Sequence, residues 1–181
     1  MLEDVHAARP HLVWKVSPDK AGEAIFSPCG AYRYALARET TVPGGPTRAC
    51  LFVMLNPSTA TEEKFDPSVR RCLDYATRWG YGRLYVGNFG AYRSTSPEVF
   101  RAQKDPYGPD NDAVLDLLVR KSAYVVVAWG GNALELDPAR ASALAERLAK
   151  SVRVFALKRN KDGSPVHPLY QPKLITPVEF R

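Results

Sequence analysis

Four polar side chains that could bind a ligand or assist catalysis stand where apolar segments of the sequence give way to turns. They are Asn56 after residues 51–55, Asn88 after 84–87, Asn132 after 123–128 and His167 after 152–157. An amide can donate and accept hydrogen bonds, and an imidazole can also carry a proton. If these turns meet in the folded chain, they predict a binding site built from hydrogen-bonding groups.

His167 has the sharpest chemical pattern of the four. The chain contains three histidines, and the other two, His6 and His11, lie near the first residue. Pro165 and Pro168 flank His167 and stiffen its backbone, which suits a positioned catalytic donor. The alternative is a surface histidine in a proline-rich turn. No second histidine or acidic residue stands at ligand spacing, so we expect no metal and no other cofactor.

The elements that must position these side chains alternate between strand and helix. Continuous apolar runs such as "ACLFVML" are typical of strands covered on both faces. Asp66 and Pro67 predict a helix start, followed by a buried stripe through Cys72 and a stop at Gly80, and the Asp-Pro pair at 137–138 predicts a second helix start. This alternation predicts an α/β fold, with a central, mainly parallel sheet of four strands.

Parallel strands joined by helices place their carboxyl ends along one edge of the sheet, where open α/β sheets bind ligands. We therefore expect six side chains to converge there: Asn56, Asn88, Arg93, Trp129, Asn132 and His167. Each also has a simpler interpretation. Asn56 can merely cap a turn, Trp129 can merely pack, and Gly130 and Gly131 can merely allow a tight passage from strand to helix.

The length of 181 residues fits a single domain, 1–181. Within it the sequence predicts an irregular arm over 1–20, an N-terminal β-hairpin over 22–40, a loop over 41–47 and a parallel-sheet core over 49–170. The hairpin prediction rests on Tyr32, Tyr34 and Leu36, which alternate with Arg33 and Ala35 as in a half-buried strand.

Composition narrows the classes of protein. The net charge of +6 favours anionic partners such as nucleic acid or nucleotides, although generic surface charge explains it equally well. Three cysteines without a C-x-x-C pair argue against a disulfide framework. Neither a signal peptide nor a membrane span is present, so we expect a cytoplasmic monomer with no membrane partner.

The sequence lacks the motifs of several common classes of enzyme. The sequence has no P-loop, no G-x-G-x-x-G dinucleotide fingerprint and no G-x-S-x-G nucleophile elbow. Cys72 falls on the predicted buried face of its helix, so a cysteine nucleophile is not expected.

Taken in order, the turns resemble known motifs. "MLNPS", "YVGNF", "VVAWGGNA" and "VHPLY" are similar to motifs of the uracil-DNA glycosylase superfamily, in particular its mismatch-specific branch. More closely, "LNPSTA", "DPSVRRC", "WGYG", "NFGAYRST", "AWG" and "HPLY" resemble the bacterial and phage family called domain of unknown function 1643, over about residues 22–171. The glycosylase resemblance implies a three-layer α/β/α fold and hydrolysis of the N-glycosidic bond of a modified or mismatched base in DNA.

The resemblance also implies roles for residues. Asn56 would position the attacking water, and His167 would stabilise negative charge on the departing base. Asn88 would hydrogen-bond a flipped base, assisted by Phe65 as the stacking ring and by Ser58 and Tyr170. Contacts to DNA would come from Leu169 as a wedge and from Arg70, Arg71, Arg93, Lys158, Arg159 and Lys161.

The sequence departs from the glycosylase pattern in ways that keep other functions open. Asn56 stands where the fastest uracil enzymes have Asp, and Tyr170 adds a bulky group beside the predicted site. One alternative is a non-catalytic module that binds a base or nucleotide in the same cleft. Another is a hydrolase of small nucleosides or nucleotides.

Overall fold

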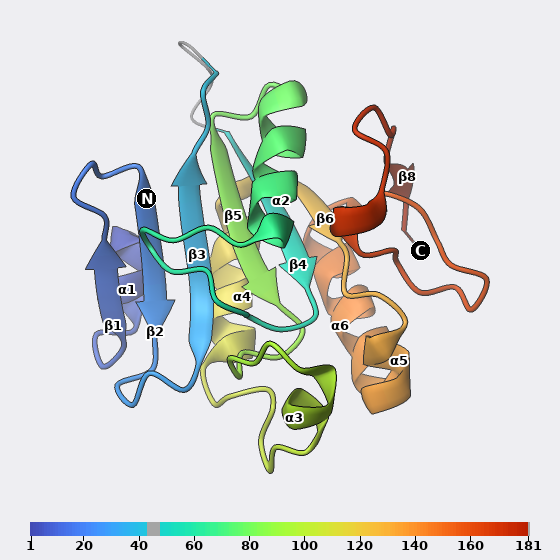
Figure 1. The fold of residues 1–181 in the computed structure, drawn as a ribbon, viewed down its shortest axis with the longest axis horizontal. Coiled ribbons are helices and arrows are strands. Elements are labelled where there is room, and N and C mark those ends of the chain that lie inside the picture. Colours follow the sequence, from blue (N-terminus) through green and yellow to red (C-terminus); the bar gives the residue numbers. More distant parts are fainter. Residues whose placement is uncertain (43–47, 181) are drawn as a thin grey trace.

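The computed structural model describes residues 1–42 and 48–180, and within them eight strands form one sheet (Figure 1). The strand order across the sheet is β1-β2-β3-β5-β4-β6-β7-β8. The strands are β1 (Val13–Val16), β2 (Gly22–Phe26), β3 (Arg33–Glu39), β4 (Ala49–Met54), β5 (Arg83–Asn88), β6 (Ser122–Val127), β7 (Val154–Ala156) and β8 (Val178–Glu179).

The prediction of a mainly parallel, four-stranded sheet needs correction. Of the seven pairings between the described strands, four are antiparallel: β1 with β2, β2 with β3, β3 with β5, and β7 with β8. The hairpin of β2 and β3 forms as expected, but it pairs with β5 and thereby extends the sheet. The four strands that the sequence indicated, β5, β4, β6 and β7, lie side by side and are parallel.

The predicted irregular arm is also structured. Residues Glu3–Ala8 form helix α1, and β1 follows within the same arm. Glu23 of β2 holds this segment, because its carboxylate accepts hydrogen bonds from the Leu2 backbone N–H and from Trp14 Nε1. Leu2 and Val5 are buried in the core. Of the loop predicted over 41–47, residues 43–47 lie outside the described part of the chain.

The other described helices connect and cover the strands. They are α2 (Pro67–Arg78), α3 (Pro97–Arg101), α4 (Asn111–Arg120), α5 (Asn132–Leu136), α6 (Pro138–Ser151) and the 3₁₀ helix η1 (Pro168–Tyr170). The Asp-Pro starts behave as predicted: Asp66 Oδ1 accepts from Val69 N at 2.8 Å, and Asp137 accepts from Arg140 N at 2.9 Å. Helix α2 lies on one face of the sheet, while α1, α4 and α6 lie on the other (Figure 1).

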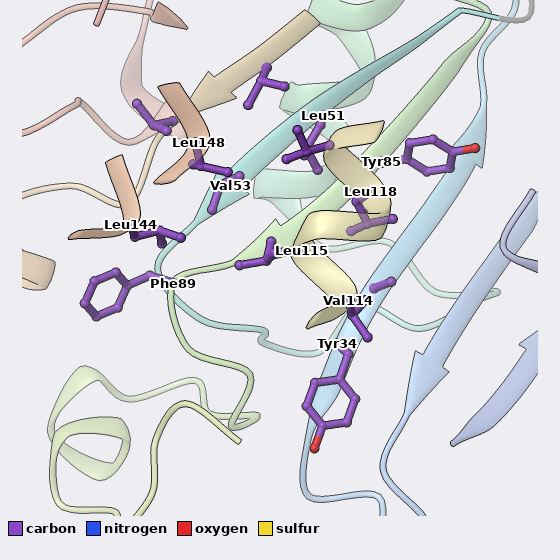
Figure 2. Close-up of a cluster of buried hydrophobic side chains, with 14 of the residues drawn as sticks. Tyr34, Leu51, Val53, Tyr85, Phe89, Val114, Leu115, Leu118, Leu144 and Leu148 are labelled. Carbon is purple, nitrogen blue, oxygen red and sulfur yellow. The ribbon is translucent and has the colours of Figure 1, made fainter. Parts of the chain in front are cut away.

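Strand β4 shows how the core is divided. Leu51 and Val53 point toward α4 and α6, where Leu115, Leu118 and Leu148 complete a buried cluster (Figure 2). The alternate residues Cys50, Phe52 and Met54 point toward α2. Both faces of this strand are therefore covered, as its continuous apolar run predicted.

No helix within residues 1–42 and 48–180 is both long and apolar enough to cross a membrane.

Candidate functional site

A cavity of about 630 Å³ opens where β4 and β6 end, at their carboxyl ends. Five connecting segments and two strand residues line it. The lining residues are Met54 of β4 and Arg33 of β3; Leu55, Asn56 and Ser58 after β4; Asp66 and Ser68 at the start of α2; Ser94, Thr95 and Pro97 after β5; Trp129, Gly130, Gly131, Asn132 and Glu135 after β6; and Asn160, Val166, His167, Leu169, Tyr170 and Gln171 after β7.

Asn56 presents an acceptor to this cavity. Its Nδ2 donates to the carbonyl of Pro57 at 3.0 Å and to the carbonyl of Ser94 at 2.8 Å. Both N–H groups of the amide are thus engaged, and Oδ1 accepts no hydrogen bond from the described residues. The backbone fixes the turn further, because Ser94 N donates to Pro57 O at 2.9 Å. The side chain can therefore hold a water molecule through Oδ1.

His167 presents a donor to the same cavity. Leu169 N donates to its Nδ1 at 3.3 Å, so the neutral ring carries its proton on Nε2. Burial lowers the pKa of His167, although the carboxylate of Asp66 opposes this effect. The loop that carries it is held against the β6 turn, since Gly130 N donates to Pro165 O at 3.0 Å. At neutral pH the ring is therefore a fixed, uncharged donor.

Asn88 lies inside the protein instead of on the cavity surface. It is 1% exposed and pairs across the sheet with Met54, which does line the cavity. Its Nδ2 and Oδ1 have no hydrogen-bond partner among the described residues, while its backbone oxygen accepts from Asn111 Nδ2 at 2.9 Å. The structure thus brings Asn56 and His167 together, and Asn132 and Trp129 with them, but leaves Asn88 one strand away.

Of the other residues expected to contact a base, some line the cavity and one does not. Ser58, Leu169 and Tyr170 line the cavity, and Tyr170 stands at its rim with 84% of its surface exposed. Phe65 does not line it. Its ring lies between the guanidinium groups of Arg38 and Arg70, with their Cζ atoms 4.6 and 4.8 Å from the ring centroid. Cation–π contacts of this kind occupy the ring faces that a base would need.

The predicted phosphate-binding cations lie outside the cavity. Arg93 lines an adjoining groove of about 750 Å³, together with Lys64, and this groove shares Ser58, Ser94 and Thr95 with the cavity. Lys158, Arg159 and Lys161 are exposed in the loop whose Asn160 lines the cavity. Arg70 and Arg71 sit on α2, and neither lines the cavity or the groove.

Three charged residues at the cavity were not expected from the sequence: Arg33, Asp66 and Glu135. Alternation with Tyr32 and Tyr34 placed Arg33 on the exposed face of a half-buried strand, yet it is 1% exposed. Pairing with β5 places β3 inside the sheet, and the segment after β4 then covers the Arg33 guanidinium, where Nη1 donates to the Ala60 carbonyl at 2.7 Å. Asp66, expected only as a helix cap, also lines the cavity. The signal that could have indicated the burial of Arg33 is its place beside the buried Tyr34 in a strand that continues the sheet.

A comparison with protein-family models matches residues 33–169 to the family described as protein of unknown function (DUF1643). The match covers more than half of the chain, so the chain belongs to this family. No curated protein and no solved structure matches the chain. The resemblance to the uracil-DNA glycosylase superfamily therefore rests on the sequence motifs alone.

Proposed function

We propose that this member of the DUF1643 family hydrolyses the N-glycosidic bond of a modified or mismatched base in DNA. The observation that carries the proposal is the pairing of an acceptor, Asn56 Oδ1, with a neutral donor, His167 Nε2, on the surface of one cavity. Cleavage of such a bond needs a positioned water, a donor for the charge that develops on the departing base, and shelter from bulk water.

In this proposal, Asn56 holds the water that attacks the anomeric carbon. The bond between sugar and base breaks, the electron pair leaves with the base, and His167 donates a hydrogen bond from Nε2 to the charge that develops there. An amide cannot take the proton of the water. Asp66 is a carboxylate on the same cavity surface, and its Oδ1 is held by Val69 N at 2.8 Å. We assign it the role of proton acceptor.

The surroundings of the cavity support a nucleic-acid substrate. The groove with Arg93 and Lys64 runs into the cavity through shared lining residues, and it could follow a phosphate backbone. Leu169 and Tyr170 stand on η1 at the cavity edge, where an apolar side chain could replace a base that has left the stack. The net charge of +6 agrees with such a partner.

A panel of labelled DNA duplexes tests the reaction. The panel carries uracil, thymine mismatches and modified pyrimidines, and the readout is free base detected by mass spectrometry under single turnover. We expect base release from at least one substrate. Asp66→Asn should slow it at least about tenfold, because the amide keeps the helix cap but cannot accept a proton. If no substrate releases a base although the duplexes bind, the hydrolase proposal fails.

The alternative favoured by a specific observation is non-catalytic binding of a base or nucleotide. Asn56 is an amide, so the residue at the predicted water position cannot act as a base. A binding module predicts that Asn56→Ala and Asp66→Asn change duplex affinity without any substrate showing base release. A small-nucleoside hydrolase predicts instead that free nucleosides are cleaved, and that Arg93→Gln leaves this cleavage unchanged.

A further inference from the structure

Arg33 is a buried cation without a counter-ion in the described part of the chain. Its guanidinium lines the cavity, yet the residue is only 1% exposed. Nη1 donates to the carbonyl of Ala60 at 2.7 Å, Nε has no hydrogen-bond partner, and no carboxylate of residues 1–42 and 48–180 lies within ion-pair distance. A guanidinium has five N–H donors, so most of its bonding capacity remains.

The neighbouring Arg38 is a buried arginine with more partners among the described residues, although its Nε, like that of Arg33, has none. It is 2% exposed, and its guanidinium donates to the carbonyl groups of Ala37, Thr61 and Lys64. Its guanidinium also lies over the ring of Phe65. Arg33 has one carbonyl partner and no aromatic partner among the described residues. Because an unpaired buried charge is costly, the difference indicates a partner that the described residues do not supply.

The charges around Arg33 are consistent with an anion as that partner. Burial, opposed by the carboxylate of Asp66 and assisted by the nearby cations Arg93 and Arg38, lowers the pKa of Arg33 to about 10. The guanidinium thus stays charged at neutral pH. Two cations and one carboxylate therefore act on Arg33, while the cavity lining also carries the carboxylate of Glu135.

We propose that Arg33 forms the inner wall of an oxyanion subsite, which takes a carboxylate or phosphate group of the ligand. The planar guanidinium fork matches the two oxygens of either group. Two sources of the oxyanion fit the cavity: an acidic substituent on a base, or the phosphate of a nucleotide. The inference goes beyond the reaction proposed above, because binding of the anion requires no turnover and is measured without it.

Thermal unfolding with simple probes tests the subsite. The probes are inorganic phosphate, thymidine 5′-monophosphate and the pyrimidine carboxylate orotate, with sodium chloride at equal ionic strength and neutral uracil as controls. We expect phosphate, and at least one of the two organic anions, to raise the unfolding temperature more than the controls do. A larger effect of orotate indicates the base substituent as the source, and a larger effect of the monophosphate indicates the nucleotide. If no anion exceeds the controls, the subsite does not exist.

Variants separate a binding role from a structural one. Arg33→Met should lower the affinity for the stabilising anion at least about tenfold, while leaving stability in chloride unchanged or higher, because the unpaired charge is removed. Arg120→Gln removes an exposed cation at the end of α4 and should leave anion affinity unchanged. If the anion stabilises Arg33→Met and the unaltered protein equally, the assignment is overturned.

A measurement on the unaltered protein covers the case in which Arg33→Met does not fold. The ¹⁵N-labelled Nε–H group of Arg33 is itself buried, and its resonance should shift as phosphate is added, because an oxyanion on the cavity side of the guanidinium changes the charge around it. A resonance that stays in place at saturating phosphate would equally overturn the proposal.

Discussion

At the level of single residues, Asn56 shows why an amide occupies the place of a carboxylate. Its two N–H groups donate to the carbonyl oxygens of Pro57 and Ser94. A carboxylate has no hydrogens to donate, so an aspartate would set a charged oxygen against those carbonyls. The turn therefore requires the amide, and any catalysis must obtain its proton acceptor elsewhere in the cavity.

This argument predicts the effect of Asn56→Asp on folding. We expect a loss of about 1–3 kcal/mol in the free energy of unfolding at pH 7, because the Ser94 carbonyl loses its donor and the Pro57 carbonyl keeps only the Ser94 N–H. The loss should shrink as the pH falls toward 4, since a protonated carboxyl regains one O–H donor. Urea unfolding at both pH values measures it. An unaltered free energy of unfolding at pH 7 would show that the amide is not needed by the turn.

His167 makes a second prediction at this scale. Its folded-state pKa is lowered by burial, so the unfolded chain takes up the proton first as the pH falls. The stability that neutral His167 contributes is fully present above the unfolded pKa of about 6.5 and is lost as the pH falls toward the folded value. Thermal unfolding between pH 7.5 and 4.5 should show less of this decline in His167→Gln. The control His11→Gln, on an exposed histidine, should retain the full decline; equal declines in both variants would contradict the assignment.

At the level of elements, the turn between β6 and α5 positions His167. The two glycines of this turn differ in backbone conformation. Gly130 has φ +73°, whereas Gly131 at the start of α5 has φ −63°. The sequence indicated only that both could ease the passage from strand to helix. The backbone assigns the left-handed conformation to Gly130 alone, at the residue whose N–H holds Pro165 and hence the His167 loop.

We therefore expect Gly130→Ala to destabilise the fold by about 1–2 kcal/mol, because a Cβ disfavours the left-handed region. Gly131→Ala should cost less, since its φ suits any residue and an added Cβ would meet side-chain oxygens of Asp162 at 3.2 Å and Ser164 at 3.7 Å. Guanidinium unfolding of the two variants compares them directly. A larger loss for Gly131→Ala would mean that the turn is held by packing instead of by backbone conformation.

The helices and strands also show which parts of the fold the sequence could predict and which it could not. Buried strands and Asp-Pro helix starts carry local signals, so the parallel strands and the beginnings of α2 and α6 were found. The edge strands β1 and β8 have four and two residues, too few for a period to emerge. They form because the sheet offers an unpaired edge, which is a property of the assembled fold.

Considered as a whole, the molecule has one cavity at which residues from β3 to η1 meet, and this explains the limits of prediction for the site. Asn56 and His167 were predictable because each follows a strand end. Arg33 was not, because its burial depends on a hairpin joining the sheet through β5. Asn88 was expected at the cavity on the same strand-end argument, but the strand continues one residue further and keeps it inside.

Charge distribution gives a prediction at this scale. If DNA follows the groove beside the cavity, Arg93→Gln should reduce the slope of log affinity against log salt concentration by about 0.9. Arg78→Gln removes an exposed cation that already pairs with Asp74 on α2, and should leave the slope unchanged. Fluorescence anisotropy with a labelled duplex at several salt concentrations provides the slopes. Equal slopes for the two variants would place the DNA elsewhere.

The central claim is that Asn56 and His167 act on one ligand in one cavity, and the most direct measurement is single-turnover release of free base by Asn56→Ala, His167→Gln and the double variant. We predict that each single change slows release at least about 100-fold. The double change should slow release by a factor clearly smaller than the product of the two single factors. Release by either single variant within about twofold of the unaltered protein, or fully multiplicative losses, would contradict the claim.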